Sequence, residues 1–173
     1  QKRRLSRKEQ NSNNSKAVLE KIKKIENKLD NVYNDYMNKL LARLDKNSTF
    51  YLSIIERVYR EKNDIKNSIA TNNELLKRNG IGTREFSMIA FSQALNYRNL
   101  GDRESEKKYL ILSSISDIKA SVKDNAATTE LALMLFRQGD LERAHHNINF
   151  AFEDAAFFNS KLRFVSISNI LPI

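Results

Sequence analysis

The stretch FRQGDLERAHHNINFAFEDA, residues 136–155, joins a helix stop to a helix start and carries both histidines of the chain. Apolar and small residues recur at three- and four-residue steps on both sides of Gly139, which indicates two helices. Gly139 accepts the left-handed backbone that ends a helix, and Asp140 is a favourable N-cap for the next one. The stretch therefore predicts a helical hairpin, and its adjacent histidines raise the question of a metal or catalytic site.

The same stop and start recur at a fixed distance along the chain. The breaks fall at Asn63-Asp64, Gly101-Asp102 and Gly139-Asp140, each 38 residues after the last. A helical hairpin repeated at a fixed period of about 20 to 50 residues is typical of a solenoid, and no strand pattern competes with it. We therefore expect an all-α helical-hairpin solenoid. Its expected units are about 48–82, 83–124 and 125–158, with a partial unit at 159–173 that ends near Pro172.

Polar residues beside these units predict individual helix boundaries. Ser48 or Thr49 can cap the first helix of the first unit, and Thr83 can cap the first helix of the second. Asn79-Gly80 is a favourable left-handed stop at the end of the first unit.

The composition limits the class of protein. The chain has 173 residues with 40% apolar and 29% charged residues, 4 Gly and 1 Pro, which is typical of a helical protein. It has no Cys, so disulfides, thiol catalysis and Cys-ligated zinc are excluded. The sequence contains no run of about 20 apolar residues, so it predicts no membrane span within these residues. Because the sequence starts without Met and ends in the apolar ILPI, we expect a piece of a longer protein.

Residues 1–46 differ from the rest in charge. They hold 13 Lys and Arg against 6 Asp and Glu, a net charge of +7, whereas residues 47–173 hold 17 against 15, a net charge of +2. The polar residues 1–15 predict a linker or a disordered arm.

A long amphipathic helix is expected over roughly residues 16–45. Its apolar residues recur at steps of three and four, close to a heptad, so the helix can form a homo-oligomeric coiled coil or pack on the core of its own chain. These residues are Val18, Leu19, Ile22, Ile25, Leu29, Val32, Tyr33, Tyr36, Met37, Leu40, Leu41 and Leu44.

The residues around the breaks resemble the tetratricopeptide repeat. Its pattern is a small residue at position 8, a large one at 11, Gly at 15, small at 20, large at 24 and small at 27. The third unit follows it with Ala132, Leu135, Gly139, Ala144, Ile148 and Ala151. The second unit keeps Ala94 and Gly101 but has Glu106 at a small position. The first has Glu56 and Asn63 at the small and Gly positions, so its inclusion depends on spacing.

A narrower resemblance covers about residues 84–173, where ISDIK, GDLERA and ILPI occur in that order. The segment is similar to the repeat region of a bacterial family of unknown function. That family combines tetratricopeptide repeats with a membrane helix and a cytoplasmic part that is expected to regulate transcription. The resemblance implies an extracytoplasmic, periplasmic sensor domain of a membrane protein, with a cytoplasmic location as the alternative. It does not extend to residues 1–46.

The sequence offers little chemistry for catalysis. His145 and His146 point about 100° apart on a helix, and a helical zinc pair needs histidines four residues apart, so we expect no metal site. The segment NGIGT at 79–83 lacks the strand and the Lys of a phosphate-binding loop. Neighbouring carboxylates such as Glu153-Asp154 are typical of solvated helix faces. We expect no catalytic residue, no cofactor and no enzymatic activity.

Binding of a protein or peptide is the expected function. In a solenoid of helix pairs the first helices line a groove. In this register Arg60, Arg98 and Arg137 fall at nearly equivalent places, which favours a partner with carboxylates and an apolar anchor. The candidate groove residues are Arg57, Arg60, Met88, Phe91, Arg98, Leu133, Phe136 and Arg137. The alternative for the arginines is pairing with neighbouring acids on a solvated face.

The basic arm supports a second hypothesis. Lys2, Arg3, Arg4, Arg7 and Lys8 can neutralise phosphates, which would suit a soluble adaptor or a nucleic-acid-associated protein. No aromatic residue is interleaved with these charges, so the favoured hypothesis is a non-enzymatic sensor or interaction region of a bacterial membrane-anchored regulator.

Overall fold

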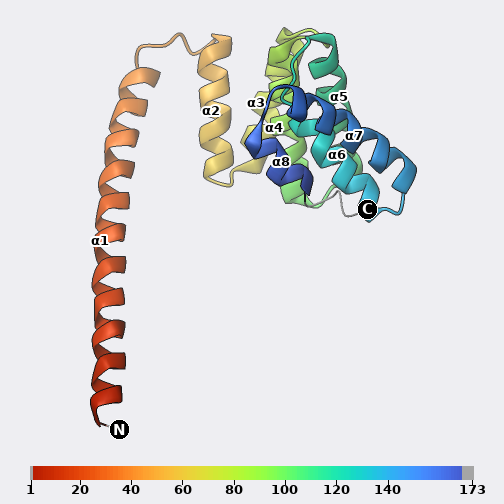
Figure 1. Ribbon diagram of the computed structural model, residues 1–173. Coiled ribbons are helices and arrows are strands. Elements are labelled where there is room, and N and C mark those ends of the chain that lie inside the picture. The colour runs from red at the N-terminus through yellow and green to blue at the C-terminus, as the bar shows by residue number, and fades with distance from the viewer. Residues whose placement is uncertain (1, 169–173) are drawn as a thin grey trace. The chain divides into compact units, whose positions relative to one another are not determined.

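The computed structural model describes residues 2–168, with side chains from Ser15 onward except those of Ala17, Leu162 and Ser166. This part of the chain contains eight helices and no strand (Figure 1). The predicted all-α solenoid class is therefore confirmed. The helices are α1 Lys2–Leu41, α2 Thr49–Glu61, α3 Ile65–Arg78, α4 Arg84–Leu100, α5 Arg103–Lys119, α6 Ala126–Arg137, α7 Leu141–Phe157 and α8 Lys161–Ser168.

The chain divides into two compact units, Gln1–Lys46 and Asn47–Ile173. The first unit holds α1, which begins at Lys2 and ends at Leu41. The prediction of a linker over residues 1–15 was therefore wrong. That segment holds five Lys and Arg with six Asn and Ser, and it contains no Gly or Pro that would break a helix.

In the second unit the helices form antiparallel pairs that stack in chain order. α2 packs on α3, α4 on α5 and α6 on α7, while α3 also contacts α4, and α5 also contacts α6. The last helix, α8, packs on α7 and begins the partial unit (Figure 1). Pro172, the predicted end of that unit, lies outside the described residues. No helix within residues 2–168 has both the length and the apolar character to cross a membrane.

The three turns inside the pairs, which recur every 38 residues, share one backbone geometry. Asn63, Gly101 and Gly139 all have left-handed backbones, with φ of 57°, 75° and 80°. The N–H of the Asp that follows each one donates to the carbonyl five residues earlier, at 2.8 Å for Asp64 and 3.0 Å for Asp102 and Asp140. This is the Schellman closure of a helix C-terminus. Each Asp side chain then caps the next helix.

The connection from the first pair to the second differs from the expectation. Ser48 and Thr83 cap their helices as predicted, but Asn79 is extended and Gly80 is not left-handed. The Asn79 amide instead donates to Leu75 O at 2.8 Å and satisfies a carbonyl at the helix end. The left-handed residue is Gly82, whose N–H donates to Ser116 Oγ at 3.2 Å.

The apolar core lies mainly between α4 and α8. Ala94, Ala132 and Ala144, the small residues of the repeat pattern, are buried where the paired helices cross. One cluster joins Ala94 and Leu110 to Leu131 and Leu135, and a second joins Ile148, Ala151 and Ala155 to Ile167. The second unit of the chain is therefore a stack whose first helices are held in fixed order along one side.

Candidate functional site

The first helices of the pairs line a hollow of about 450 Å³. Met88 and Phe91 of α4 give it an apolar floor, and Met88 is 63% exposed. We name it the apolar hollow. Its lining residues are Arg60, Met88, Phe91, Ser92, Leu95, Asp124, Ala126, Thr129, Glu130 and Arg163. They come from α2, α4, α6 and α8 and from the residues before α6, so this is the groove side of the solenoid.

A second hollow, of about 530 Å³, lies between α4, α5 and α6, and we name it the arginine hollow. Glu130 lines both hollows, so the two are neighbours. The lining of the arginine hollow is Arg98, Arg103, Glu106, Glu130, Leu133, Met134, Arg137 and Gln138. Three guanidinium groups face two carboxylates there, which leaves one positive charge.

The charges of the arginine hollow are unequally paired. Arg98 donates from Nε to Glu106 Oε1 at 2.5 Å and from Nη2 to Glu130 Oε2 at 2.8 Å. Arg103 donates to the other oxygen of Glu106 at 2.7 Å. Partial burial acts to lower the pKa of Arg98, but the hydrogen bonds to Glu106 and Glu130 outweigh it and raise the pKa. Within the described part of the chain, Arg137 is exposed and has no acidic partner.

A third hollow, of about 300 Å³, lies between α2, α3 and α4 and includes Arg57, Arg60 and Met88 in its lining. Arg57 donates to Glu61 at 2.7 Å on the surface, and Arg60 Nε lies 3.4 Å from Glu56 Oε1. Met88 and Arg60 also line the apolar hollow, so the groove continues from α2 to α6.

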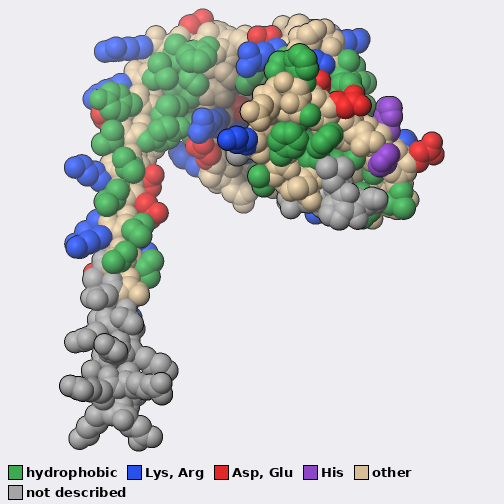
Figure 2. All heavy atoms as spheres, in the orientation of Figure 1, with side chains coloured by type: hydrophobic (Ala, Val, Ile, Leu, Met, Phe, Trp, Pro, Cys, Tyr) green, Lys and Arg blue, Asp and Glu red, His purple; other side chains and the backbone are tan. Residues whose placement is uncertain are grey.

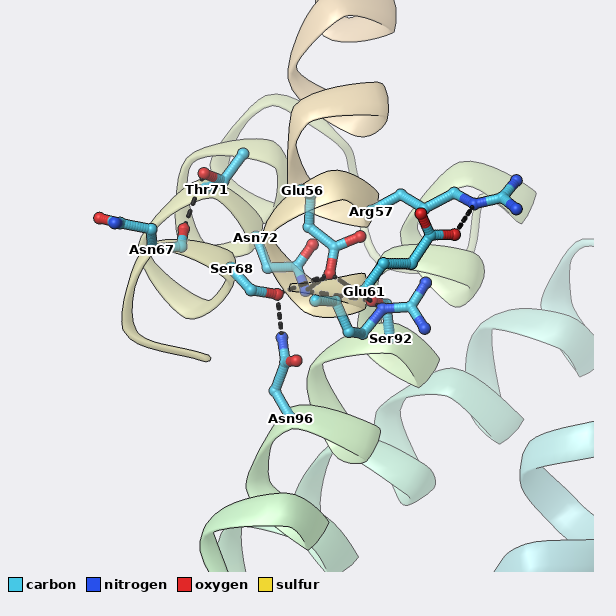
Figure 3. Close-up of polar contacts among 10 residues, drawn as sticks. Glu56, Arg57, Glu61, Asn67, Ser68, Thr71, Asn72, Ser92 and Asn96 are labelled. Carbon is cyan, nitrogen blue, oxygen red and sulfur yellow. Dashed lines mark hydrogen bonds and ion pairs between the residues drawn. The ribbon is translucent and has the colours of Figure 1, made fainter. Parts of the chain in front are cut away.

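Glu56 forms a buried polar network under this third hollow (Figure 3). Its side chain points from α2 toward α3 and α4 and is 5% exposed. Glu56 Oε1 accepts from Ser68 Oγ at 2.8 Å, Ser92 Oγ at 2.7 Å and Asn72 Nδ2 at 3.3 Å. The Ser68 hydroxyl in turn accepts from Asn96 Nδ2 at 2.7 Å. A buried carboxylate is tolerated because several donors replace its water.

The predicted groove residues therefore fall into separate groups. Met88 and Phe91 meet Arg60 in the apolar hollow, and Arg98, Leu133 and Arg137 meet in the arginine hollow. Phe136 lines neither of them and is partly buried against the core cluster around Leu135.

Sequence reasoning missed the acids that organise this side. Glu56 and Glu106 stand at small-residue positions of the repeat, and that departure was the only sign that carboxylates are buried here. Asp117 is a third buried acid, which accepts from Ser87 Oγ at 2.5 Å. Burial raises the pKa of Asp117.

The two histidines of the opening stretch form no buried polar network of this kind. His145 and His146 are both exposed on α7, and the Asn149 amide lies 3.2 Å from His145 Nε2. Within the described residues, no cluster of three or more His, Asp or Glu side chains could hold a metal ion.

Helix pairs with left-handed turns, small residues at their crossings and a lined inner side define a tetratricopeptide-like scaffold. A family comparison matches residues 9–169 to the SusR N-terminal TPR domain, and the chain belongs to that family. The match begins inside α1, so it includes most of the segment that the sequence resemblance left out. No curated protein and no solved structure matches the chain. Repeats of this class are typically non-enzymatic scaffolds that commonly bind proteins or peptides.

Proposed function

We propose that the side lined by α2, α4 and α6 binds a protein or peptide segment that carries carboxylate groups and an apolar side chain. The observation that carries this proposal is Arg137, an exposed guanidinium without an acidic partner among the described residues, in a hollow with one excess positive charge. A guanidinium binds a carboxylate through two parallel hydrogen bonds.

Arg98 has a different role in this proposal. Its guanidinium already bridges Glu106 and Glu130, which fixes the wall of the arginine hollow. A substitution of Arg98 would leave Glu106 buried with a lost partner, so it would damage the fold as well as binding. Arg137 is the cleaner position for a test because its removal breaks no ion pair.

The apolar hollow supplies the second half of the recognition. Met88 is 63% exposed, although Met is ordinarily a core residue, and Phe91 and Leu95 lie beside it. A flexible thioether beside an aromatic ring adapts to different apolar side chains. A Leu or Phe of the partner fits this place while its carboxylates reach Arg137.

The test uses short fluorescent peptides that carry paired Asp or Glu residues and one Leu or Phe, with matched peptides in which Asn or Gln replaces the acids. The acidic peptides are expected to bind and their amide counterparts to bind at least about tenfold more weakly, because a charge-assisted hydrogen bond contributes roughly 1.5 to 3 kcal/mol. The substitution Arg137→Gln should weaken the acidic peptides by a similar factor.

Lys66→Gln is the matched control for this substitution. Lys66 is an exposed cation on α3, the second helix of its pair, and it lines none of the three hollows. Its loss removes the same charge from the protein, so any general electrostatic effect is equal. Equal losses for the two variants, or unchanged affinity for Arg137→Gln, would contradict the proposal.

We also propose that the chain is the sensor or interaction region of a bacterial membrane-anchored regulator of transcription, and that this part lies outside the cytoplasm. Two points support this: the resemblance of residues 84–173 to such regulators, and a family description that names an N-terminal domain. The test inserts, after Ser168, a phosphatase that is active only outside the cytoplasm. The proposal predicts that this phosphatase is active. The second reporter is a fluorescent protein that is active only in the cytoplasm, inserted at the same position. An inactive phosphatase together with a fluorescent second reporter would favour a cytoplasmic adaptor.

A further inference from the structure

The helix α1 carries a row of apolar side chains that its own unit leaves uncovered (Figure 2). The row consists of Val18, Ile22, Ile25, Leu29, Val32 and Tyr36, which are 45% to 67% exposed, and we name it the α1 stripe. Most of α1, including the whole stripe, lies inside the family match that begins at residue 9. The stripe therefore lies within the matched domain, and exposed apolar surface of this extent on a helix marks an interaction site.

The spacing of the stripe identifies the kind of partner. Its steps are four, three, four, three and four residues, which is a heptad with Ile22, Leu29 and Tyr36 at a and Val18, Ile25 and Val32 at d. Between Val18 and Asn34, the positions b, c and f, which point away from the seam, are all polar. This seam, with the exposed e residues Leu19, Tyr33 and Leu40 beside it, fits other helices that carry the same repeat.

We propose that α1 forms a parallel, in-register coiled coil with other copies of this chain. In that arrangement each g position meets the e position five residues further along its neighbour. Lys21 then faces Glu26 of the neighbouring copy, and the remaining g positions, Lys28 and Asp35, face Tyr33 and Leu40. The one charged pair across this seam, Lys21 with Glu26, is attractive.

The antiparallel arrangement is disfavoured by the same charges. When two stripes overlap fully in opposite directions, Lys28 faces the second Lys28 and Glu26 faces the second Glu26. These like charges offset the attraction of Lys21 for Asp35. The parallel orientation is therefore the one that the charge pattern selects.

A lipid surface is a poorer fit to this helix. Membrane-surface helices carry Lys and Arg along the polar face. Between residues 16 and 36 the acids Glu20, Glu26, Asp30 and Asp35 alternate with five lysines, so the helix does not present a continuous basic face to an anionic membrane. The residues at d indicate how many chains associate. Val18, Ile25 and Val32 are β-branched, and β-branched residues at d favour three or four strands over two.

The first experiment measures the mass of the chain in solution over about a hundredfold range of concentration. We expect the mass to rise to three or four chains, and the substitution Leu29→Asp to hold it at one chain. Asn27→Asp is the control, because it adds the same charge at an outward position and should leave the association unchanged. A single-chain mass at every concentration overturns the proposal, as does binding to anionic phospholipid vesicles by the single chain.

The second experiment tests orientation and uses the absence of Cys from the chain. Ile22→Cys should form a disulfide between copies under mild oxidation, since a parallel, in-register seam places the two positions opposite each other. Lys24→Cys, which points away from the seam, should not. In an antiparallel pair, position 22 of one copy lies opposite position 32 of the other. A disulfide that forms only when Ile22→Cys chains are mixed with Val32→Cys chains would therefore overturn the proposed orientation.

Discussion

The first and third helix pairs share one backbone plan but bury different chemistry. Leu135 and Ile148 fill the space between α6 and α7, whereas α2 and α3 place the half-buried Tyr59 and the buried Asn72 at the equivalent positions. At the crossing the third pair has Ala132, and the first pair has Glu56 with its network of hydroxyl and amide donors. Both pairs nevertheless turn through a left-handed residue followed by an Asp cap.

The difference shows that the turn, more than the identity of the core, fixes the repeat. A carboxylate can take the place of a small apolar residue where hydroxyls and amides from two neighbouring helices satisfy it. The first pair should consequently be more sensitive to loss of a single polar group than the third pair.

The largest effect is expected from Glu56→Ala. This substitution leaves Ser68, Asn72 and Ser92 without their shared acceptor in a buried place, so we expect a loss of about 3 to 5 kcal/mol in the free energy of unfolding. Urea denaturation of residues 1–173 measures it. Glu61→Ala, which removes only a surface pair with Arg57, should cost less than about 1 kcal/mol. Similar losses for the two variants would mean that the network does not hold the first pair.

The next effect is expected in the third pair. Leu135→Ala should cost about 2 to 4 kcal/mol, because Leu135 is buried in the core cluster and its removal leaves a cavity. Leu141→Ala, at an exposed position of the same pair, should change stability by less than about 0.5 kcal/mol. If Leu135→Ala is tolerated as well as Leu141→Ala, the apolar packing assigned to the third pair is wrong.

A smaller effect separates the turns themselves. Gly139→Ala should cost about 1 to 2 kcal/mol, since φ is 80° and an added Cβ would meet no atom within 4 Å, which leaves backbone strain as the cause. Gly139→Asn, the residue type that the first pair uses at Asn63, should cost less. Gly80→Ala is the control, as Gly80 is not left-handed and its added Cβ also meets nothing. Thermal unfolding that ranks Ala and Asn equally at 139 would contradict this account of the turn.

The smallest effect concerns acid. The hydrogen bond from Arg143 holds the pKa of Asp140 below its ordinary value. A folded-state pKa below the unfolded one gives stability that is present above the unfolded value, near pH 4, and is lost as pH falls through the folded pKa. Asp140→Asn keeps a capping oxygen but cannot titrate, so its unfolding midpoint should fall less steeply in acid than that of the wild type. Parallel curves would contradict this role for Asp140.

The sequence predicted the fold class because its strongest signals are local. Gly101 and Gly139 mark helix ends by backbone chemistry alone, and the Asp after each begins the next helix, so the period could be read without any tertiary information. Asn63 was recognised only by its distance from them. The error at residues 1–15 arose because a polar composition was read as disorder, although nothing there prevents a helix.

The pairing of Arg98 could not be predicted, unlike the local pairs of Arg57 with Glu61 and of Arg60 with Glu56. Glu106 and Glu130 lie 8 and 32 residues from Arg98 in the sequence and meet it only because α4, α5 and α6 pack together. Repeat register placed Arg98 and Arg137 on one side of the solenoid, but it carries no information on which guanidinium is neutralised. That distinction depends on Glu106, whose place at a small-residue position signals only a buried carboxylate, and on Glu130, which the repeat pattern does not mark.

The most direct test of the proposed binding face uses the three methionines of the chain. Met88 lies in the apolar hollow, the buried Met134 lines the arginine hollow and Met37 is on α1, so ¹³C-methyl signals of methionine report on three separate places. At a fixed protein concentration, an acidic peptide with one Leu or Phe should shift the Met88 signal, and that of Met134 beside Arg137, and leave the Met37 signal unchanged. A shift of Met37 with Met88 unmoved, or no shift at any of the three, would contradict binding in the groove.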